Sequence, residues 1–172
     1  MENNIIELVQ EKSSYYLEFK KYNFKTLAQI GKNGLTLNHK EGDKKTQMGT
    51  FELGIAIGTH EKEEINTKLS YLKINKNMYW IDDVNSEYYN QLIDSNYIKT
   101  GWESGEHLID FSNQYEYAIE IKTNPENIKG KGSAMFIHCF GKNPYTAGCI
   151  AIDKQKMLEL LRLVDQYTKI KI

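Results

Sequence analysis

A histidine and a cysteine in the C-terminal part of the chain, His138 and Cys149, have side chains that together can perform chemistry. Each adjoins a short apolar run, and the segment between them contains Gly141, Asn143 and Pro144. We expect two adjacent strands whose connecting loop could bring the thiol and the imidazole within hydrogen-bond reach. A neighbouring imidazole favours the thiolate and can protonate a leaving amine. The residue types therefore allow nucleophilic acyl transfer.

Gly148 comes directly before Cys149 and would let the backbone approach a substrate closely. Backbone N–H groups around Cys149 could then stabilise an oxyanion. The residues alone also allow a plainer interpretation, because cysteine is often a small buried hydrophobe and a lone histidine is often structural. The second cysteine, Cys139, leaves further alternatives open: a disulfide, two inert thiols or one working thiol.

The elements that must position this pair are mainly strands. Alternating β-branched and aromatic residues predict strands at 15–19, 51–55 and 117–121, and loops are expected at 33–34 and 40–45. A short helix is predicted at 86–93. An amphipathic helix is predicted at 153–167, with Asp153 as its N-cap. Many short strands followed by one terminal helix indicate a mostly β domain with minor α content, either a sandwich or an open barrel.

Composition limits the class of protein. A length of 172 residues suits one domain, 1–172, with its core at about residues 15–168. A net charge of −1 provides no basic field for nucleic acid. The longest apolar runs are far shorter than the ~20 residues of a membrane-spanning helix. The cysteines and histidines lack the close spacing of familiar metal sites, so we expect neither a metal nor another cofactor.

Four sequence blocks resemble those of the L,D-transpeptidase (YkuD-like) catalytic domain family. Residues 42–51, GDKKTQMGTF, are similar to its GDxKTPxGTF pattern, and residues 132–138, GSAMFIH, are similar to GSAIFLH. Residues 146–150, TAGCI, resemble the nucleophile motif, whereas 82–90 together with 106–108 resemble one branch of the family. The blocks occur in family order over residues 30–164. The resemblance implies the fold of that catalytic domain.

The resemblance also implies a reaction. Cys149 would attack the carbonyl of the L,D bond before the terminal D-Ala of a peptidoglycan tetrapeptide stem, and D-Ala would leave. An amine of a neighbouring stem would resolve the thioester and form a 3→3 cross-link, while His138 moves the protons. A backbone carbonyl that orients the histidine ring maps onto Cys139, whose thiol need not react. The family acts outside the cytoplasmic membrane; the chain begins without a signal-peptide pattern, and we favour removal of an export segment.

Residues expected to bind substrate or an oxyanion are Thr146, Ala147, Gly148, Glu106 and His107. Two departures from the family motif leave the acyl acceptor open: alanines occupy positions 147 and 151, and the loop between histidine and cysteine is short. The alternatives are therefore an L,D-carboxypeptidase, in which water is the acceptor, and a catalytically silent peptidoglycan-binding module. Carbapenems are expected to acylate Cys149.

Two expectations concern the environments of individual side chains. The Cys149 thiolate should form well below the ordinary cysteine pKa of ~8.5, because His138 lies beside it. His39 and His60 flank loops and are expected to be solvated.

Overall fold

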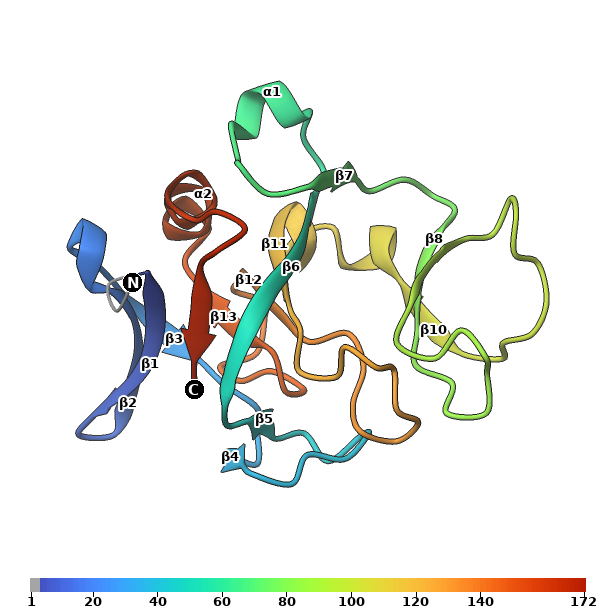
Figure 1. Ribbon diagram of the computed structural model, residues 1–172, viewed down its shortest axis with the longest axis horizontal. Coiled ribbons are helices and arrows are strands. Elements are labelled where there is room, and N and C mark those ends of the chain that lie inside the picture. The colour runs from blue at the N-terminus through green and yellow to red at the C-terminus, as the bar shows by residue number, and fades with distance from the viewer. Residues whose placement is uncertain (1–3) are drawn as a thin grey trace.

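Eight strands of the computed structural model, which describes residues 4–172, form a closed mixed β-barrel (Figure 1). The strand order is β11-β12-β13-β3-β2-β1-β14-β6, and pairing of β6 with β11 closes the ring. The barrel strands are β1 (Ile5–Glu11), β2 (Ser14–Phe19), β3 (Phe24–Gln29), β6 (Thr50–Gly58), β11 (Tyr117–Ile121), β12 (Phe136–Cys139), β13 (Ile150–Ile152) and β14 (Lys169–Lys171). The expected mostly β fold is confirmed.

Two strand pairs of the barrel are parallel, β12 with β13 and β1 with β14, and the others are antiparallel. β7 (Tyr71–Lys73) extends the sheet beside β6. β1 and β14 lie outside the expected core at residues 15–168, yet both are barrel strands. β14 has only three residues, two of them lysines, so the sequence carries little signal of a strand there.

Helix α2 (Lys154–Leu163) packs over β11 and β12 (Figure 1). Asp153 caps it as expected, because its Oδ1 accepts hydrogen bonds from the backbone N–H groups of Gln155 and Lys156 at 2.9 and 3.2 Å. Met157, Leu160 and other apolar side chains on one face are fully buried in the core. The helix ends at Leu163, before the expected end at residue 167, because the chain becomes extended at Val164 and turns into β14.

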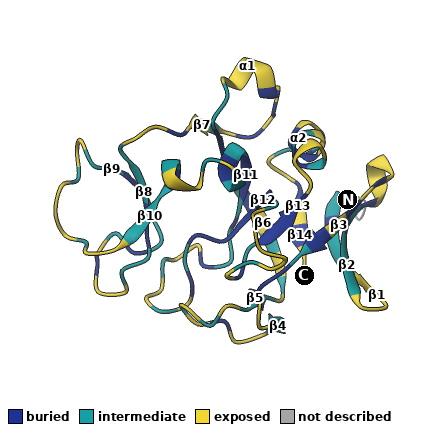
Figure 2. Ribbon diagram, turned by 180° about the vertical axis from the view of Figure 1, so that it is seen from behind, coloured by how far each residue is buried: buried dark blue, intermediate teal, exposed yellow. Residues whose placement is uncertain are grey.

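A smaller three-stranded sheet lies beside the barrel and carries part of the site. It consists of β8 (Met78–Ile81), β9 (Leu92–Asp94) and β10 (Gly105–His107). The 3-10 turns η2 (Leu108–Phe111) and η3 (Gln114–Glu116) lead from this sheet to β11. Buried Trp80, Leu108, Tyr115 and Phe136 form a second core between the two sheets. Figure 2 shows buried residues, in dark blue, along β11 and β12. Trp80 of β8 packs against Phe136 of β12, with ring centroids 4.9 Å apart, so this sheet lies against the strand that carries His138.

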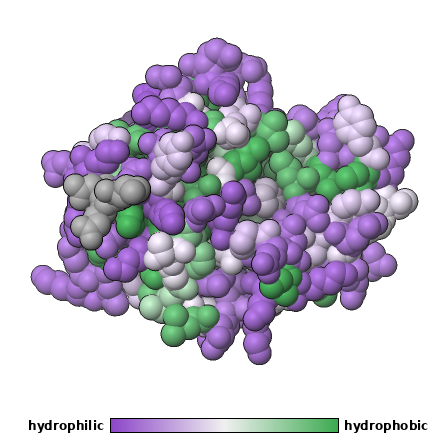
Figure 3. Space-filling view, viewed as in Figure 1, coloured by the Kyte–Doolittle hydropathy of each residue, from purple (hydrophilic) through white to green (hydrophobic). Residues whose placement is uncertain are grey.

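The remaining elements are short. They are η1 (Lys20–Tyr22), the two-residue strands β4 (Leu35–Thr36) and β5 (Thr46–Gln47), and helix α1 (Lys62–Ile65). Polar side chains cover most of the face in Figure 3, with smaller apolar areas between them. Within residues 4–172, no helix is sufficiently long and apolar to cross a membrane.

The prediction of a helix at residues 86–93 is wrong. The segment forms successive turns that lead into β9, and Asn90 has a φ of 58°, which a right-handed helix does not allow. Ser86 stabilises the turn, because its hydroxyl accepts from Tyr88 N–H and donates to the Gly101 carbonyl. Local side-chain bonds to the backbone compete here with helix formation.

The expectation of a solvated side chain is wrong for His39 and holds only in part for His60. His39 is only 8% exposed, its ring lies against Gly132, and its Nδ1 lies 3.0 Å from a carboxylate oxygen of Asp43. An added Cβ at Gly132 would come within 2.3 Å of that ring, so the glycine is required there. His60 is half-buried, bonds to Glu116 and stacks on Tyr117.

Candidate active site

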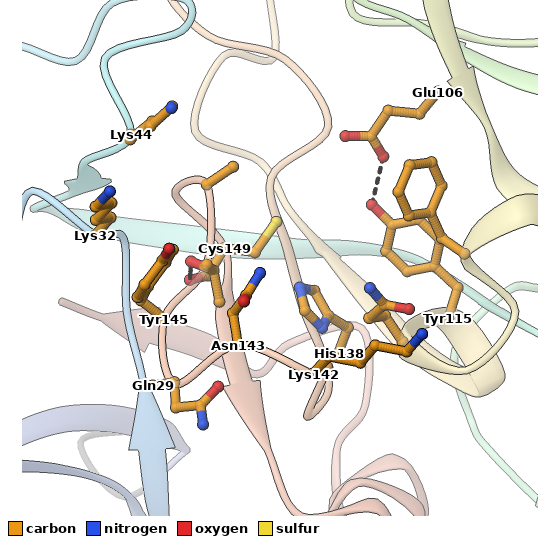
Figure 4. A pocket seen from close by; sticks show the side chains of 15 residues that line it. Gln29, Lys32, Lys44, Glu106, Tyr115, His138, Lys142, Asn143, Tyr145 and Cys149 are labelled. Atoms are coloured by element: carbon orange, nitrogen blue, oxygen red, sulfur yellow. Dashed lines mark hydrogen bonds between the residues drawn. The ribbon is translucent and has the colours of Figure 1, made fainter.

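His138 and Cys149 lie on one face of the parallel pair β12–β13. The register pairs Ile137 with Ile150 and His138 with Ala151, and Cys149 directly precedes β13. Alternate residues of a strand project to the same face, so the imidazole and the thiol share one side of the sheet. Both side chains line one pocket of about 400 Å³ (Figure 4). The structure therefore brings together the two residues singled out in the sequence.

The imidazole of His138 is held in one tautomer. Its Nδ1 lies 2.8 Å from the backbone carbonyl of Cys139, which can only accept, so Nδ1 carries the proton and Nε2 is left as the basic nitrogen. The ring is buried against the edge of the Tyr115 ring, with centroids 5.6 Å apart. Burial lowers the pKa of His138, so the imidazole is neutral at neutral pH.

The thiol of Cys149 is hydrogen-bonded to the chain that leads into β12. Its Sγ donates to the Ala134 carbonyl at 3.2 Å and accepts from the Phe136 N–H at 3.3 Å. Burial raises the pKa of the thiol to about 12, and the charge of Glu106 acts in the same direction. The expected low thiol pKa is therefore wrong. A neutral, buried histidine supplies no positive charge, and desolvation disfavours the thiolate.

The loop before the cysteine is held by hydroxyl groups. The Thr146 hydroxyl donates to the Cys149 carbonyl at 2.6 Å and accepts from the Gly148 N–H at 3.0 Å. Gly148 has a φ of 149°, and an added Cβ would lie 3.0 Å from the Lys45 carbonyl oxygen. The glycine thus lets two backbone segments approach closely beside the thiol.

Thr46, which belongs to the block at residues 42–51, links this loop to another part of the chain by hydrogen bonds. It is fully buried, accepts from the Gly31 N–H at 2.9 Å and donates to the Gly148 carbonyl at 2.6 Å. The hydroxyl thus joins two loops that are distant in the sequence.

Thr46→Val should destabilise the protein by about 2–3 kcal/mol, because valine fills the same volume and leaves a buried donor and acceptor unpaired. Urea unfolding would measure the change. Thr50→Val, at an exposed position on β6, is the matched control and should alter stability by less than about 0.5 kcal/mol. Equal losses in the two variants would contradict this role for Thr46.

The block at residues 82–90 positions the strand that carries the histidine. The Asn90 side-chain oxygen accepts from Trp80 Nε1 at 3.0 Å and from the Ala134 N–H at 3.2 Å. The Tyr89 hydroxyl accepts from the Gly132 N–H at 2.9 Å. These bonds hold the segment in which Ala134 takes a φ of 51°. They orient the carbonyl to which the Cys149 thiol donates.

Glu106 and His107 do not act together. Successive residues of a strand point to opposite faces, and in β10 only Glu106 faces the pocket. Its Oε2 accepts from the Tyr115 hydroxyl at 2.5 Å (Figure 4). His107 instead stacks on Tyr79, with centroids 4.4 Å apart, and bonds to the Lys76 carbonyl. The expected contribution of His107 to substrate binding is not supported, because its ring lies outside the pocket lining.

The remaining residues expected to bind substrate or an oxyanion differ in their position relative to the pocket. Thr146 and Ala147 line the pocket, whereas Gly148 lies buried behind the thiol. Pocket-lining residues that sequence reasoning missed come from separate parts of the chain: Gln29, Lys32, Lys44, Phe111, Gln114, Tyr115, Gly141, Lys142, Asn143 and Tyr145. Lys44 lies in the block at 42–51, and residues 141–145 lie in the loop between the histidine and the cysteine. The others belong to no motif, so only the tertiary structure identifies them as neighbours. Residues 141–145 are exposed, which leaves this side of the pocket open.

Both cysteines are free thiols, so the disulfide alternative is excluded. The Cys139 side chain is 2% exposed, lies 3.6 Å from the Tyr117 carbonyl, and has a pKa that burial raises to about 11. It faces the hydrophobic core, away from His138, because adjacent residues of β12 alternate sides. Among residues 4–172, no group of three or more His, Cys, Asp or Glu side chains is arranged to hold a metal.

Comparison with protein families assigns the chain. The model of the YkuD family, described as the L,D-transpeptidase catalytic domain, matches residues 5–172. The chain belongs to this family. Family membership implies peptidoglycan as the substrate and hence a site of action outside the cytoplasm. No curated protein and no solved structure matched the chain. The sequence resemblance to L,D-transpeptidase domains is thereby confirmed, over a longer range than its motifs cover.

Proposed function

We propose that this YkuD domain is a peptidoglycan L,D-transpeptidase with Cys149 as the nucleophile and His138 as the general base. The observation that carries the proposal is the shared pocket, in which a thiol lies with an imidazole whose Nε2 is free to accept a proton. The Cys139 carbonyl acts only by orienting the ring, and the Cys139 thiol does not react.

In the first step, Nε2 of His138 takes the thiol proton as Sγ attacks the carbonyl of the L,D bond in a tetrapeptide stem. Because both groups are neutral at rest, proton transfer accompanies the attack and no ion pair is formed beforehand. The carbonyl oxygen becomes an oxyanion. The Gly148 N–H is already bonded to Thr146, so we assign the oxyanion to the N–H of Cys149. The imidazolium then protonates the departing amine of D-Ala.

In the second step, the amine of another stem attacks the thioester and His138 accepts its proton. The new amide is a 3→3 cross-link, and the thiol is restored. Water in place of the amine would make the same protein an L,D-carboxypeptidase. The exposed segment at 141–145 leaves room for a second peptide, which favours the amine as acceptor. The cell wall or periplasm is the compartment in which both stems occur.

Incubation with defined tetrapeptide stems, followed by mass spectrometry of the products, tests the proposal. We expect release of D-Ala and a dimer joined through the third residues. Tripeptide without dimer would assign the L,D-carboxypeptidase activity. Unchanged stems, with folded protein and a free Cys149 thiol, would contradict both activities and leave the silent binding module.

A further inference from the structure

The pocket contains a carboxylate without a cationic partner. Glu106 faces the pocket from β10, and one of its oxygens accepts from Tyr115. Among residues 4–172, no Lys, Arg or His side chain forms an ion pair with Glu106. Burial raises the pKa of Glu106 to about 7, because little compensates its charge. The ionised form of Glu106 is therefore disfavoured in the absence of a ligand.

Tyr115 fixes the direction of this carboxylate. The tyrosine is 4% exposed and packs in the core between the two sheets, with its ring against both Phe136 and His138. Its hydroxyl occupies Oε2 of Glu106, which leaves the other oxygen for a ligand in the pocket. A half-buried carboxylate that is oriented in this way gains most from a ligand that brings a positive charge.

Positively and negatively charged side chains lie on opposite sides of the pocket. Lys32 and Lys44 lie on one side of Cys149 in Figure 4, and Glu106 lies on the other. Neither lysine forms an ion pair within the described residues, although Lys32 lies over the Tyr145 ring at 5.2 Å. Such a pocket is complementary to a ligand with an ammonium at one end and a carboxylate at the other.

We propose that Glu106 binds an ammonium group of the peptide substrate. The inference rests on the proposed function and adds a determinant of specificity to it. The third residue of a donor stem carries such an amine, whereas the amine of an acceptor must be neutral to attack the thioester. An ammonium at Glu106 also cancels a negative charge that opposes ionisation of the nearby Cys149 thiol. A substrate with this group would thereby favour the attack that consumes it.

Matched stems test the inference. Tetrapeptides with lysine or diaminopimelate at the third position are compared with the same stems bearing an N-acetylated side-chain amine, and release of D-Ala is measured. The wild-type protein should prefer the free amine by roughly tenfold or more in kcat/KM, mainly through KM. Glu106→Gln, which keeps the side-chain volume and can accept from Tyr115, should reduce this preference to about twofold or less.

Glu120→Gln is the matched control. Glu120 is also a carboxylate whose pKa burial raises, but it accepts from the Ile55 N–H at 3.1 Å and does not line the pocket with Cys149. This variant should retain the wild-type preference. A second arm supplies the same separate acceptor amine to the free and the acetylated donor stems, so that both thioesters meet the same nucleophile. A loss of donor preference in Glu106→Gln in this arm would assign the donor's ammonium to Glu106, whereas a change only in the ratio of dimer to tripeptide would contradict that assignment.

Two negative outcomes are distinguishable. If stems react but Glu106→Gln keeps the wild-type preference for the free amine in both arms, the inference is wrong and the proposed function stands. If no stem reacts, calorimetry with Cys149→Ala protein decides the matter. Failure of every stem to bind then overturns the proposed function and the inference together. Binding that favours the free amine and depends on Glu106 would support the ammonium site without catalysis.

Discussion

Cys149→Ala should lower the rate of D-Ala release by at least about 10³-fold, since the sulfur is the atom proposed to form the covalent thioester. The folded structure should persist. Alanine removes one sulfur that is shared between two core clusters, at an expected cost of about 1 kcal/mol. Assays of purified protein with a tetrapeptide stem, together with circular dichroism of the same sample, would measure both effects.

Cys139→Ala provides the matched control for the nucleophile. It removes a thiol from the same strand pair, but that thiol faces the core, so activity should stay within about twofold while stability falls by about 1–2 kcal/mol.

Labelling by a carbapenem tests the nucleophile without a stem peptide. Its strained lactam should acylate wild-type and Cys139→Ala protein once each and leave Cys149→Ala unlabelled, as measured by intact-protein mass spectrometry. Turnover or labelling of Cys149→Ala at the wild-type rate would end the assignment.

The second large effect concerns pH. A thiol pKa of about 12 leaves on the order of a thousandth or less of the thiolate that an ordinary cysteine has at neutral pH. Alkylation of Cys149 by iodoacetamide should therefore be slow and should rise about tenfold per pH unit from pH 7 to pH 10 without a plateau. Quantitative mass spectrometry in a Cys139→Ala background follows this thiol alone.

The pH range of the labelling experiment is limited by the pH dependence of the protein's stability. Because the folded state has the raised pKa, the thiol's contribution to stability is complete below about pH 9 and is lost as pH rises toward 12. Circular dichroism at each pH should show that the protein is folded where labelling is measured. Glu106→Gln should speed labelling, since its charge opposes the thiolate, whereas Glu120→Gln should not. A plateau of the labelling rate near pH 6–7 would instead indicate a preformed thiolate–imidazolium pair.

Local sequence determined several elements of this protein. The strands at 15–19 and 117–121 are rich in aromatic and branched apolar residues, which favour strands. Asp153 marks the start of α2 because its carboxylate caps free N–H groups. The site motifs at 132–138 and 146–150 adjoin short apolar runs that became β12 and β13. Each of these signals depends only on residues that are neighbours in the sequence, so the predicted elements are also present in the folded protein.

The segment at 86–93 shows where local signals are insufficient. Its composition suits a helix, but Asn90 is required in a left-handed conformation to bond to Trp80 and to the Ala134 backbone, which lies far along the chain. Likewise, β14 is only three residues long, and it forms because β1 and β6 provide partners on both sides. In both cases distant contacts outweigh propensity, which is weak over a few residues.

Contiguous motifs identify the residues that carry the proposed chemistry, namely Cys149, His138 and Gly148. Their protonation states and their neighbours depend instead on tertiary packing. Burial keeps both Cys149 and His138 neutral, and burial depends on what packs around a side chain rather than on adjacent residues in the chain. The position of Glu106 opposite Cys149, and the turn of His107 away from it, follow from how β10 lies against the barrel. Strand alternation separates these two neighbours, and only the packed sheet decides which of them meets the substrate.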